Sequence, residues 1–229
     1  MRTTIEIYKD RVNEIELYFK ALQDLYRTQS CKDKYVFYHD DFLKILKANA
    51  LIMIYNLVES SITDGILEIY DELKSSGYSY KDVRKEIQDI WFAFKFNQVY
   101  DKTAHYNSYK DKAIEIINAI LRNEPLEMDR KATDISGNLD ANKIRKICKE
   151  HGITYKLDSS CKGGQVLEDV KNKRNELAHG TTSFAECGRY YAIDDLEKIK
   201  DETKIFLNGI LLGMKKYYDE KTFLKVVNE

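Results

Sequence analysis

The stretch from Phe42 to about Leu73 limits the fold more than any other part of the chain. It reads FLKILKANALIMIYNLVESSITDGILEIYDEL, with helix-forming residues throughout and a middle that is apolar on every side. A helix without a polar face has to be covered by other elements, so it lies in the core of a larger protein. We therefore expect this segment to be a central, buried helix, whose few polar residues are informative.

The composition favours the same class of fold. One proline and ten glycines leave few positions for tight turns, and 43% hydrophobic with 33% charged residues is a balance typical of long amphipathic helices. The sequence predicts an all-α protein built as one helical bundle over residues 1–229. The polar stretch from Glu124 to Asp140 begins an irregular insertion or excursion, which we place at 124–164.

Periodicity and capping signals predict the helices around the central one, because apolar residues recur every three or four positions. The expected helices are 5–30, 82–96, 112–123, 141–150, 165–179 and 194–218. A Ser or Asp with an acidic residue three positions later resembles a capping box, which satisfies the first free amides of a helix. Three such pairs are expected to open helices: Ser79 with Asp82, Ser108 with Asp111, and Asp194 with Glu197.

The charge balance limits the class of partner. A formal net charge of -1 gives no broad attraction to nucleic acid or to an anionic membrane, so a polyanion must be held by a local cluster of cations. The first residues, MRTTIEIYKDR, lack an apolar signal region. The longest apolar stretch, Ala50 to Val58, is interrupted by Asn56 and too short to span a bilayer. We expect a cytoplasmic protein with no membrane partner.

The cysteines predict neither a disulfide framework nor a metal site. Without a secretion signal, Cys31, Cys148, Cys161 and Cys187 are expected to be reduced thiols. Cys148 and His151 have a metal-like spacing, but the other cysteines do not complete a ligand pattern. We therefore expect no metal and no cofactor.

The segment KNKRNELAHG, residues 171–180, closes the helix expected at 165–179. On a helical wheel Arg174 lies in the middle of an apolar sector formed by Leu167, Val170, Leu177 and Ala178. An unpaired buried charge is costly, so its guanidinium must meet a carboxylate, a carbonyl, a phosphate or a partner subunit. Asn175 and His179 form an i, i+4 pair on a neighbouring face. Gly180 allows the helix to end after His179, which would leave the imidazole at the mouth of a site.

An arginine followed closely by a histidine also arises by chance, and the chain holds a second example, Arg145 with His151. Basic residues surround that pair on an amphipathic short helix, so we expect it to lie on a solvated face. The KNKRNELAHG segment differs in three ways. It has an amide directly after the arginine, an arginine on the apolar stripe and a histidine at a helix end. Together these features favour an active site over a polar helix tail.

At this point the sequence resembles a known family. RNELAH matches the Arg-Asn-x-x-x-His signature of HEPN domains, and KANALIMIYNLVES, GNLDANKIRKICKEHGI and FAECGRYYAIDDL are similar to the MAE_28990/MAE_18760-like HEPN branch. The resemblance covers the chain from about Lys47 to the last helix. It implies an all-helical homodimer that cleaves RNA without a metal, with Arg174, Asn175 and His179 as catalytic residues. It also implies a toxin or effector of a toxin-antitoxin or anti-phage defence locus, restrained by a cognate antitoxin or defence-system protein.

The residue types suit metal-independent RNA cleavage. The 2'-hydroxyl attacks its own phosphate, which requires a general base, a general acid for the leaving 5'-oxygen, and cations around the phosphorane. His179 would transfer protons, since a histidine titrates near neutral pH. Arg174 would brace the phosphate, and Asn175 would hold the phosphate or the imidazole. A two-fold dimer would supply a second histidine.

Two polar residues interrupt the most apolar part of the central helix. We expect Asn56 and Glu59 to anchor Arg174 or to orient the site, or equally to make an interhelical polar contact that fixes register. Lys171 and Lys173 give the motif helix a positive end suited to RNA.

The remaining candidates are less specific. Arg189 is a phosphate contact or a surface residue, and Tyr190 and Tyr191 are base-stacking or packing residues, with packing favoured. His39 and His105 are expected to be ordinary loop or surface residues.

Two other functions compete with a nuclease. A non-catalytic HEPN module would bind RNA or a protein partner without breaking RNA. A purely structural helical adaptor would do neither.

Overall fold

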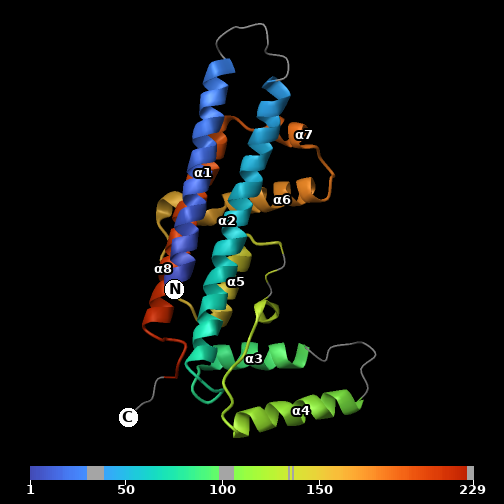
Figure 1. The fold of residues 1–229 in the computed structure, drawn as a ribbon, viewed down its shortest axis with the longest axis vertical. Coiled ribbons are helices and arrows are strands. Elements are labelled where there is room, and N and C mark those ends of the chain that lie inside the picture. Colours follow the sequence, from blue (N-terminus) through green and yellow to red (C-terminus); the bar gives the residue numbers. More distant parts are fainter. Residues whose placement is uncertain (30–38, 98–105, 134, 136, 226–229) are drawn as a thin grey trace.

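The computed structural model describes residues 1–29, 39–97, 106–133, 135 and 137–225 (Figure 1). The α-helices are α1 (Arg2–Gln29), α2 (His39–Ser75), α3 (Lys85–Asn97), α4 (Tyr106–Leu121), α5 (Ala141–His151), α6 (Val166–Ala178), α7 (Phe184–Arg189) and α8 (Ile193–Asp219). Two 3-10 turns, η2 (Arg130–Ala132) and η3 (Ser159–Gly164), lie between them. The described residues form no strand beyond isolated β-bridges, so the predicted all-α fold is confirmed.

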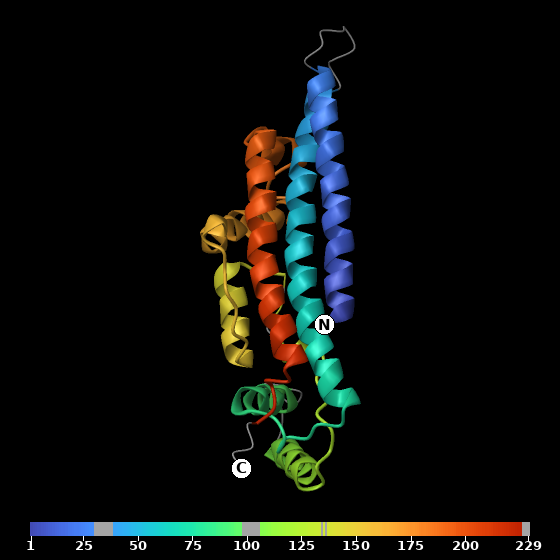
Figure 2. The same cartoon turned by 90° about the vertical axis from the view of Figure 1, so that its left-hand side faces the viewer.

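Helix α2 is the axis around which the other helices pack. It contacts α1, α6, α7 and α8, and α1 and α8 run beside it over most of its length (Figures 1 and 2). Its buried residues point in every direction around the helix: Leu51, Ile54, Tyr55, Leu57, Val58, Ile62, Ile66, Ile69 and Leu73. The prediction of a central, buried helix is therefore confirmed.

The apolar part of α2 extends further than the stretch from Ala50 to Val58. Among the described residues, the helix over Asp40–Ser75 is long and apolar enough to cross a membrane by length and composition. Within its most apolar window, 61% is buried inside the protein. This burial is typical of a core helix, whose apolar surface is covered by other helices.

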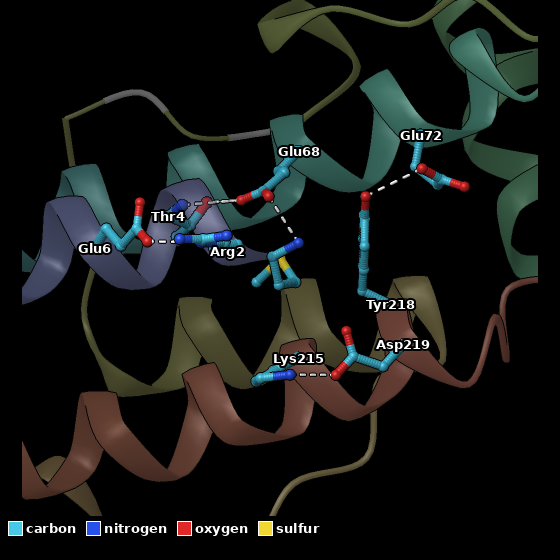
Figure 3. A network of polar contacts seen from close by, with 9 residues as sticks. Arg2, Thr4, Glu6, Glu68, Glu72, Lys215, Tyr218 and Asp219 are labelled. Carbon is cyan, nitrogen blue, oxygen red and sulfur yellow. Dashed lines mark hydrogen bonds and ion pairs between the residues drawn. The ribbon is translucent and has the colours of Figure 1, made fainter.

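A polar network joins α1, α2 and α8 at one end of the bundle (Figure 3). Thr4 of α1 donates to the Glu68 carboxylate from its backbone amide at 2.9 Å and from its hydroxyl at 2.5 Å. One turn along α2, Glu72 accepts a hydrogen bond of 3.0 Å from the Tyr218 hydroxyl of α8. Partly buried carboxylates thus fix the register of both neighbouring helices on α2.

Helix α7 was not predicted, and it packs directly on α2. Ser183 and Glu186 form a complete capping box at its start, so the sequence did carry a signal for this helix. A Cβ atom at Gly188 would lie 1.8 Å from the Lys44 carbonyl oxygen. Only glycine permits this approach, which brings the segment after the motif helix against α2.

Three predicted helix starts are wrong in detail. Ser79 does bond to the Asp82 carboxylate at 2.7 Å, but the pair forms a turn and α3 begins only at Lys85. Ser108 lies inside α4, which starts at Tyr106. The first turn of α8 is capped by Asp195, whose carboxylate accepts from the Ala192 amide at 3.2 Å, and Glu197 does not take this role.

The prediction that Arg145 and His151 lie on a solvated face is also wrong. His151 is only 3% exposed. Its Nε2 lies 2.7 Å from the Tyr70 hydroxyl oxygen, and its Nδ1 lies 2.8 Å from the Ile147 carbonyl oxygen. The Arg145 guanidinium donates to the Gly163 carbonyl. His151 falls on the same stripe of α5 as the buried residues Ile144, Ile147 and Cys148, and that stripe faces the core.

The thiols in the described part of the chain carry no bridge or metal cluster. Cys148, Cys161 and Cys187 are free and buried, whereas Cys31 lies outside the described residues. No group of three or more His, Cys, Asp and Glu side chains that could hold a metal occurs among the residues described.

The burial of His151 makes the stability of the fold depend on pH. Burial lowers the pKa of His151 from 6.5 to about 4, although the bond to the Ile147 carbonyl acts in the opposite direction. The fold therefore holds the neutral imidazole, whereas the unfolded chain binds a proton below about pH 6.5. Stability from this group is complete above pH 6.5 and falls by about 3 kcal/mol as the pH drops to 4.

We predict that a His151→Gln variant loses less unfolding free energy than the wild type between pH 7 and pH 4.5, whatever its stability at pH 7. Urea unfolding at both pH values measures this difference. Carboxylates titrate alike in both proteins, so equal pH dependence in the two would contradict the assignment.

Candidate functional site

Arg174 lies in the third turn of α6 and reaches the surface of α2. Its Cζ atom stands 4.7 Å from the centre of the Tyr55 ring, a buried residue of α2. Its Nη1 donates to the Gly137 carbonyl oxygen at 3.2 Å and to Asn175 Oδ1 at 3.0 Å. The side chain is half-buried, and no carboxylate among the described residues forms an ion pair with it. A carbonyl and an aromatic face thus meet the inward arginine.

The helical wheel is largely confirmed around this arginine. Leu167, Val170 and Leu177 are buried, as expected for the apolar sector. Ala178, which belongs to the same sector, is exposed. The apolar stripe of α6 therefore continues onto the surface at the end of the helix, next to His179.

Three consecutive residues, 137–139, hold the side chains of the motif, and we call them the clamp loop. The Gly137 carbonyl accepts from Arg174, and Asn138 Oδ1 accepts from Asn175 Nδ2 at 2.7 Å. The Leu139 amide donates to the Tyr55 hydroxyl oxygen at 3.2 Å. The clamp loop thus fixes the arginine, the amide beside it and the ring beneath it.

The backbone of the clamp loop requires glycine at its first position. Gly137 has a φ of 67°, in the left-handed region, and a Cβ atom there would lie 3.4 Å from Arg174 Nη1. The sequence prediction did not include Tyr55, Gly137 or Asn138 in the site. Their signals were a Gly-Asn pair in a polar connection and a tyrosine directly before Asn56.

His179 is exposed at the end of α6, as predicted. It is the C-cap residue, and its backbone amide donates to the Asn175 carbonyl at 3.0 Å. Its imidazole makes no hydrogen bond to any residue that the structure describes. The Asn175 side chain bonds to Arg174 and Asn138, so within one chain the amide orients the arginine and leaves the imidazole unheld.

The structure brings Asn56 and Glu59 close to Arg174, but neither anchors it directly. Glu59 pairs with Arg130 of η2 at 2.7 Å, and Asn56 is exposed. Both line a pocket of about 300 Å³ together with Arg130 and Arg174. The direct contact from α2 to Arg174 comes from Tyr55.

The lysines of the motif helix are engaged in ion pairs. Lys171 lies 2.7 Å from Asp140, the N-cap residue of α5, and therefore ties α6 to α5. Lys173 pairs with Glu176 at 2.9 Å within α6. Arg174 is then the cation of this helix that has no carboxylate partner among the described residues.

The residues after the motif divide between packing and surface. The Tyr191 hydroxyl donates to Asp169 at 2.6 Å; burial raises the pKa of Tyr191, and so does this carboxylate. Tyr191 thus packs, as favoured, whereas Tyr190 is 78% exposed. Arg189 is exposed as well. The side chains of His39 and His105 lie outside the described residues.

The comparisons with known proteins place the chain in a family. A family model for the MAE_28990-like HEPN family matches residues 3–223, nearly the whole chain. The searches of curated proteins and of solved structures gave no match. The matched residues include the motif, the clamp loop and the central helix. The chain belongs to the MAE_28990-like HEPN family.

Proposed function

We propose that this protein is a metal-independent endoribonuclease that acts as a homodimer on RNA in the cytoplasm. The observation that carries the proposal is the state of Arg174. Its guanidinium is half-buried, held by the clamp loop and Tyr55, and has no carboxylate partner among the described residues. A cation oriented in advance and not neutralised is the group that a phosphorane transition state requires.

The proton transfers are assigned to His179. An exposed imidazole at a helix end can approach a 2'-hydroxyl or a 5'-oxygen, and such a positioned group typically contributes 100- to 10,000-fold, roughly, to the rate. Asn175 keeps one amide hydrogen that its bond to Asn138 does not use, which is available for a phosphate oxygen.

The described part of one chain offers a single exposed histidine, which is too few for both proton transfers. Of the histidine side chains that the structure describes, His151 is buried and His179 is exposed. A two-fold axis near the end of α6 would place a second His179 at the same phosphate, one as base and one as acid. The exposed Ala178, on the apolar stripe of α6, offers a small flat contact for the partner helix.

The biological role rests on the resemblance to HEPN proteins. A nuclease of this kind would serve as the toxin or effector of a toxin-antitoxin or anti-phage defence system, with a cognate antitoxin or defence protein restraining it. The second candidate is a non-catalytic module for RNA or protein binding. The arrangement around Arg174 supports it as well, because stacking on Tyr55 and a bond to Gly137 also stabilise the fold.

The first prediction from this proposal concerns cleavage. Purified protein should cleave single-stranded RNA in the presence of EDTA, and His179→Ala should lower the rate by about 100-fold or more. Asn172 is exposed on the same helix, so Asn172→Ala should cleave like the wild type. Gel separation of labelled RNA measures the rates. RNA that is retained but not cut would favour the binding module, and equal cleavage by His179→Ala would reject the catalytic assignment.

The second prediction concerns the ring beneath Arg174. Tyr55→Leu removes the aromatic face and should lower the maximal cleavage rate by about 5- to 30-fold, the equivalent of roughly 1–2 kcal/mol for a cation–π contact. Tyr55→Phe keeps the face and loses only the hydroxyl, with its bond to Leu139, so it should lose less activity. Cleavage rates at saturating RNA, compared at equal folded fraction, measure the effect. If both variants lose the same activity, the ring has no positioning role.

The third prediction concerns the dimer. Ala178→Arg should convert the dimer to a monomer and abolish cleavage, because a long charged side chain would separate the two motif helices. Asn172→Arg adds the same charge on a different face of α6 and should remain dimeric. Light scattering on a size-exclusion column gives the masses. A monomeric wild type with full activity would contradict the shared site.

A further inference from the structure

A pocket of about 300 Å³ opens beside the motif, between α2, η2 and α6, and we call it the side pocket. It is lined by Asn56, Glu59, Ser60, Thr63, Asp64, Arg130 and Arg174. The geometry points to a binding site for one nucleotide of the RNA chain, next to the phosphate that is cut. This inference rests on the proposed function and adds a place where the RNA sequence is read.

The lining chemistry fits a nucleotide. Arg130 and Arg174 present two guanidinium groups, which bind phosphate oxygens through paired hydrogen bonds. The Asn56 amide and the Glu59 carboxylate match base edges, because amides bond to a donor and acceptor pair and carboxylates accept from exocyclic amines. Single-stranded RNA is recognised in this way, through unstacked bases bonded on their edges. The volume lies at the lower end of the range for small-ligand sites.

The ion pairs around the side pocket leave one cation to bind a phosphate. Glu59 compensates Arg130 at 2.7 Å, and Asp64 is compensated by Arg11 of α1 at 2.8 Å. Arg174 has no carboxylate partner among the residues described, so the lining carries one uncompensated positive charge. A single phosphodiester neutralises it without the broad positive surface that a non-specific polyanion site would need.

A buried hydroxyl in the lining lacks a partner. Thr63 is 6% exposed, and its Oγ1 forms no hydrogen bond in the described part of the protein. A buried polar group without a partner is unfavourable, and a hydrogen bond from a ligand or a water at this hydroxyl would remove that cost. The neighbouring hydroxyls of Ser60 and Ser61 bond to the Leu57 carbonyl, so Thr63 is the exception on this face of α2.

Arg174 connects the side pocket to the catalytic motif. His179 follows five residues later, which is about 7.5 Å along the helix axis. A nucleotide in the side pocket with its phosphate on Arg174 would therefore leave the neighbouring linkage near the end of α6 that carries the imidazole. Asn56 and Ser60 also border a second cavity of about 210 Å³, which Arg11 and Glu14 of α1 line as well. The RNA path would run from α1 across α2 to the end of α6.

The test uses binding without cleavage. In a His179→Ala background, fluorescence anisotropy gives Kd for the four single-stranded RNA homopolymers. The parent protein should prefer one base over another by about tenfold or more. Asn56→Ala and Thr63→Val should reduce this preference while leaving Kd for the weakest homopolymer nearly unchanged. Arg130→Gln should weaken binding to all four.

The control and the contrary outcomes are distinct from those of the cleavage test. Asn172→Ala in the same background should keep the parent's preference. Equal Kd values for the four homopolymers, no binding, or an unchanged preference in Asn56→Ala would each overturn the side pocket, even if the wild type cleaves RNA. A preference that disappears in Asn56→Ala supports the side pocket even if no cleavage is found, and in that case the nuclease proposal alone fails.

Discussion

The structure depends on the need to cover α2 on every side. A helix of this apolar character is stable in water only when other helices bury it, so α1, α8, α6 and α7 all pack against the same axis. The polar side chains of α2 are therefore few: some bond to a neighbouring helix, as Glu68 and Glu72 do, and others lie where no helix covers α2. Asn56, Glu59 and Ser60 lie there, beside the motif arginine. The hydrophobic requirement of the core thus decides where a polar site can form.

The excursion between α4 and α6 serves the motif. Its clamp loop supplies a carbonyl, an amide oxygen and a backbone amide to Arg174, Asn175 and Tyr55 in turn. The same excursion carries Arg130, which compensates Glu59. Without these contacts a half-buried guanidinium on α6 would lose most of its partners, and burial of an unsatisfied charge is strongly unfavourable. The irregular part of the chain therefore stabilises the candidate site.

The distribution of charge bears on the proposal that a nearly neutral protein acts on RNA. Cations around the motif are compensated locally: Lys171 by Asp140, Lys173 by Glu176, Arg130 by Glu59 and Arg11 by Asp64. Arg174 stands apart in the described structure, since a ring and a carbonyl stabilise its charge without cancelling it. An electrostatic focus of this kind attracts one phosphate rather than a whole polyanion, and it leaves selectivity to the polar groups nearby.

The sequence by itself determined the all-α fold, the burial of α2, the inward direction of Arg174 and the position of His179 at a helix end. Each of these follows from periodicity or from a local terminator, which the order of residues contains directly. The sequence also contains the capping box of α7 and the apolar stripe of α5 on which His151 lies. The prediction used neither signal.

Only the tertiary structure decided which atoms stand opposite these residues. The Gly137 carbonyl is 37 positions from Arg174 in the chain, and Glu59 is 71 positions from Arg130. A helical wheel shows which face turns inward but not what meets it. The clamp loop, the Tyr55 stack and the side pocket arise only when distant segments pack together, because a contact between them depends on the path of the whole chain.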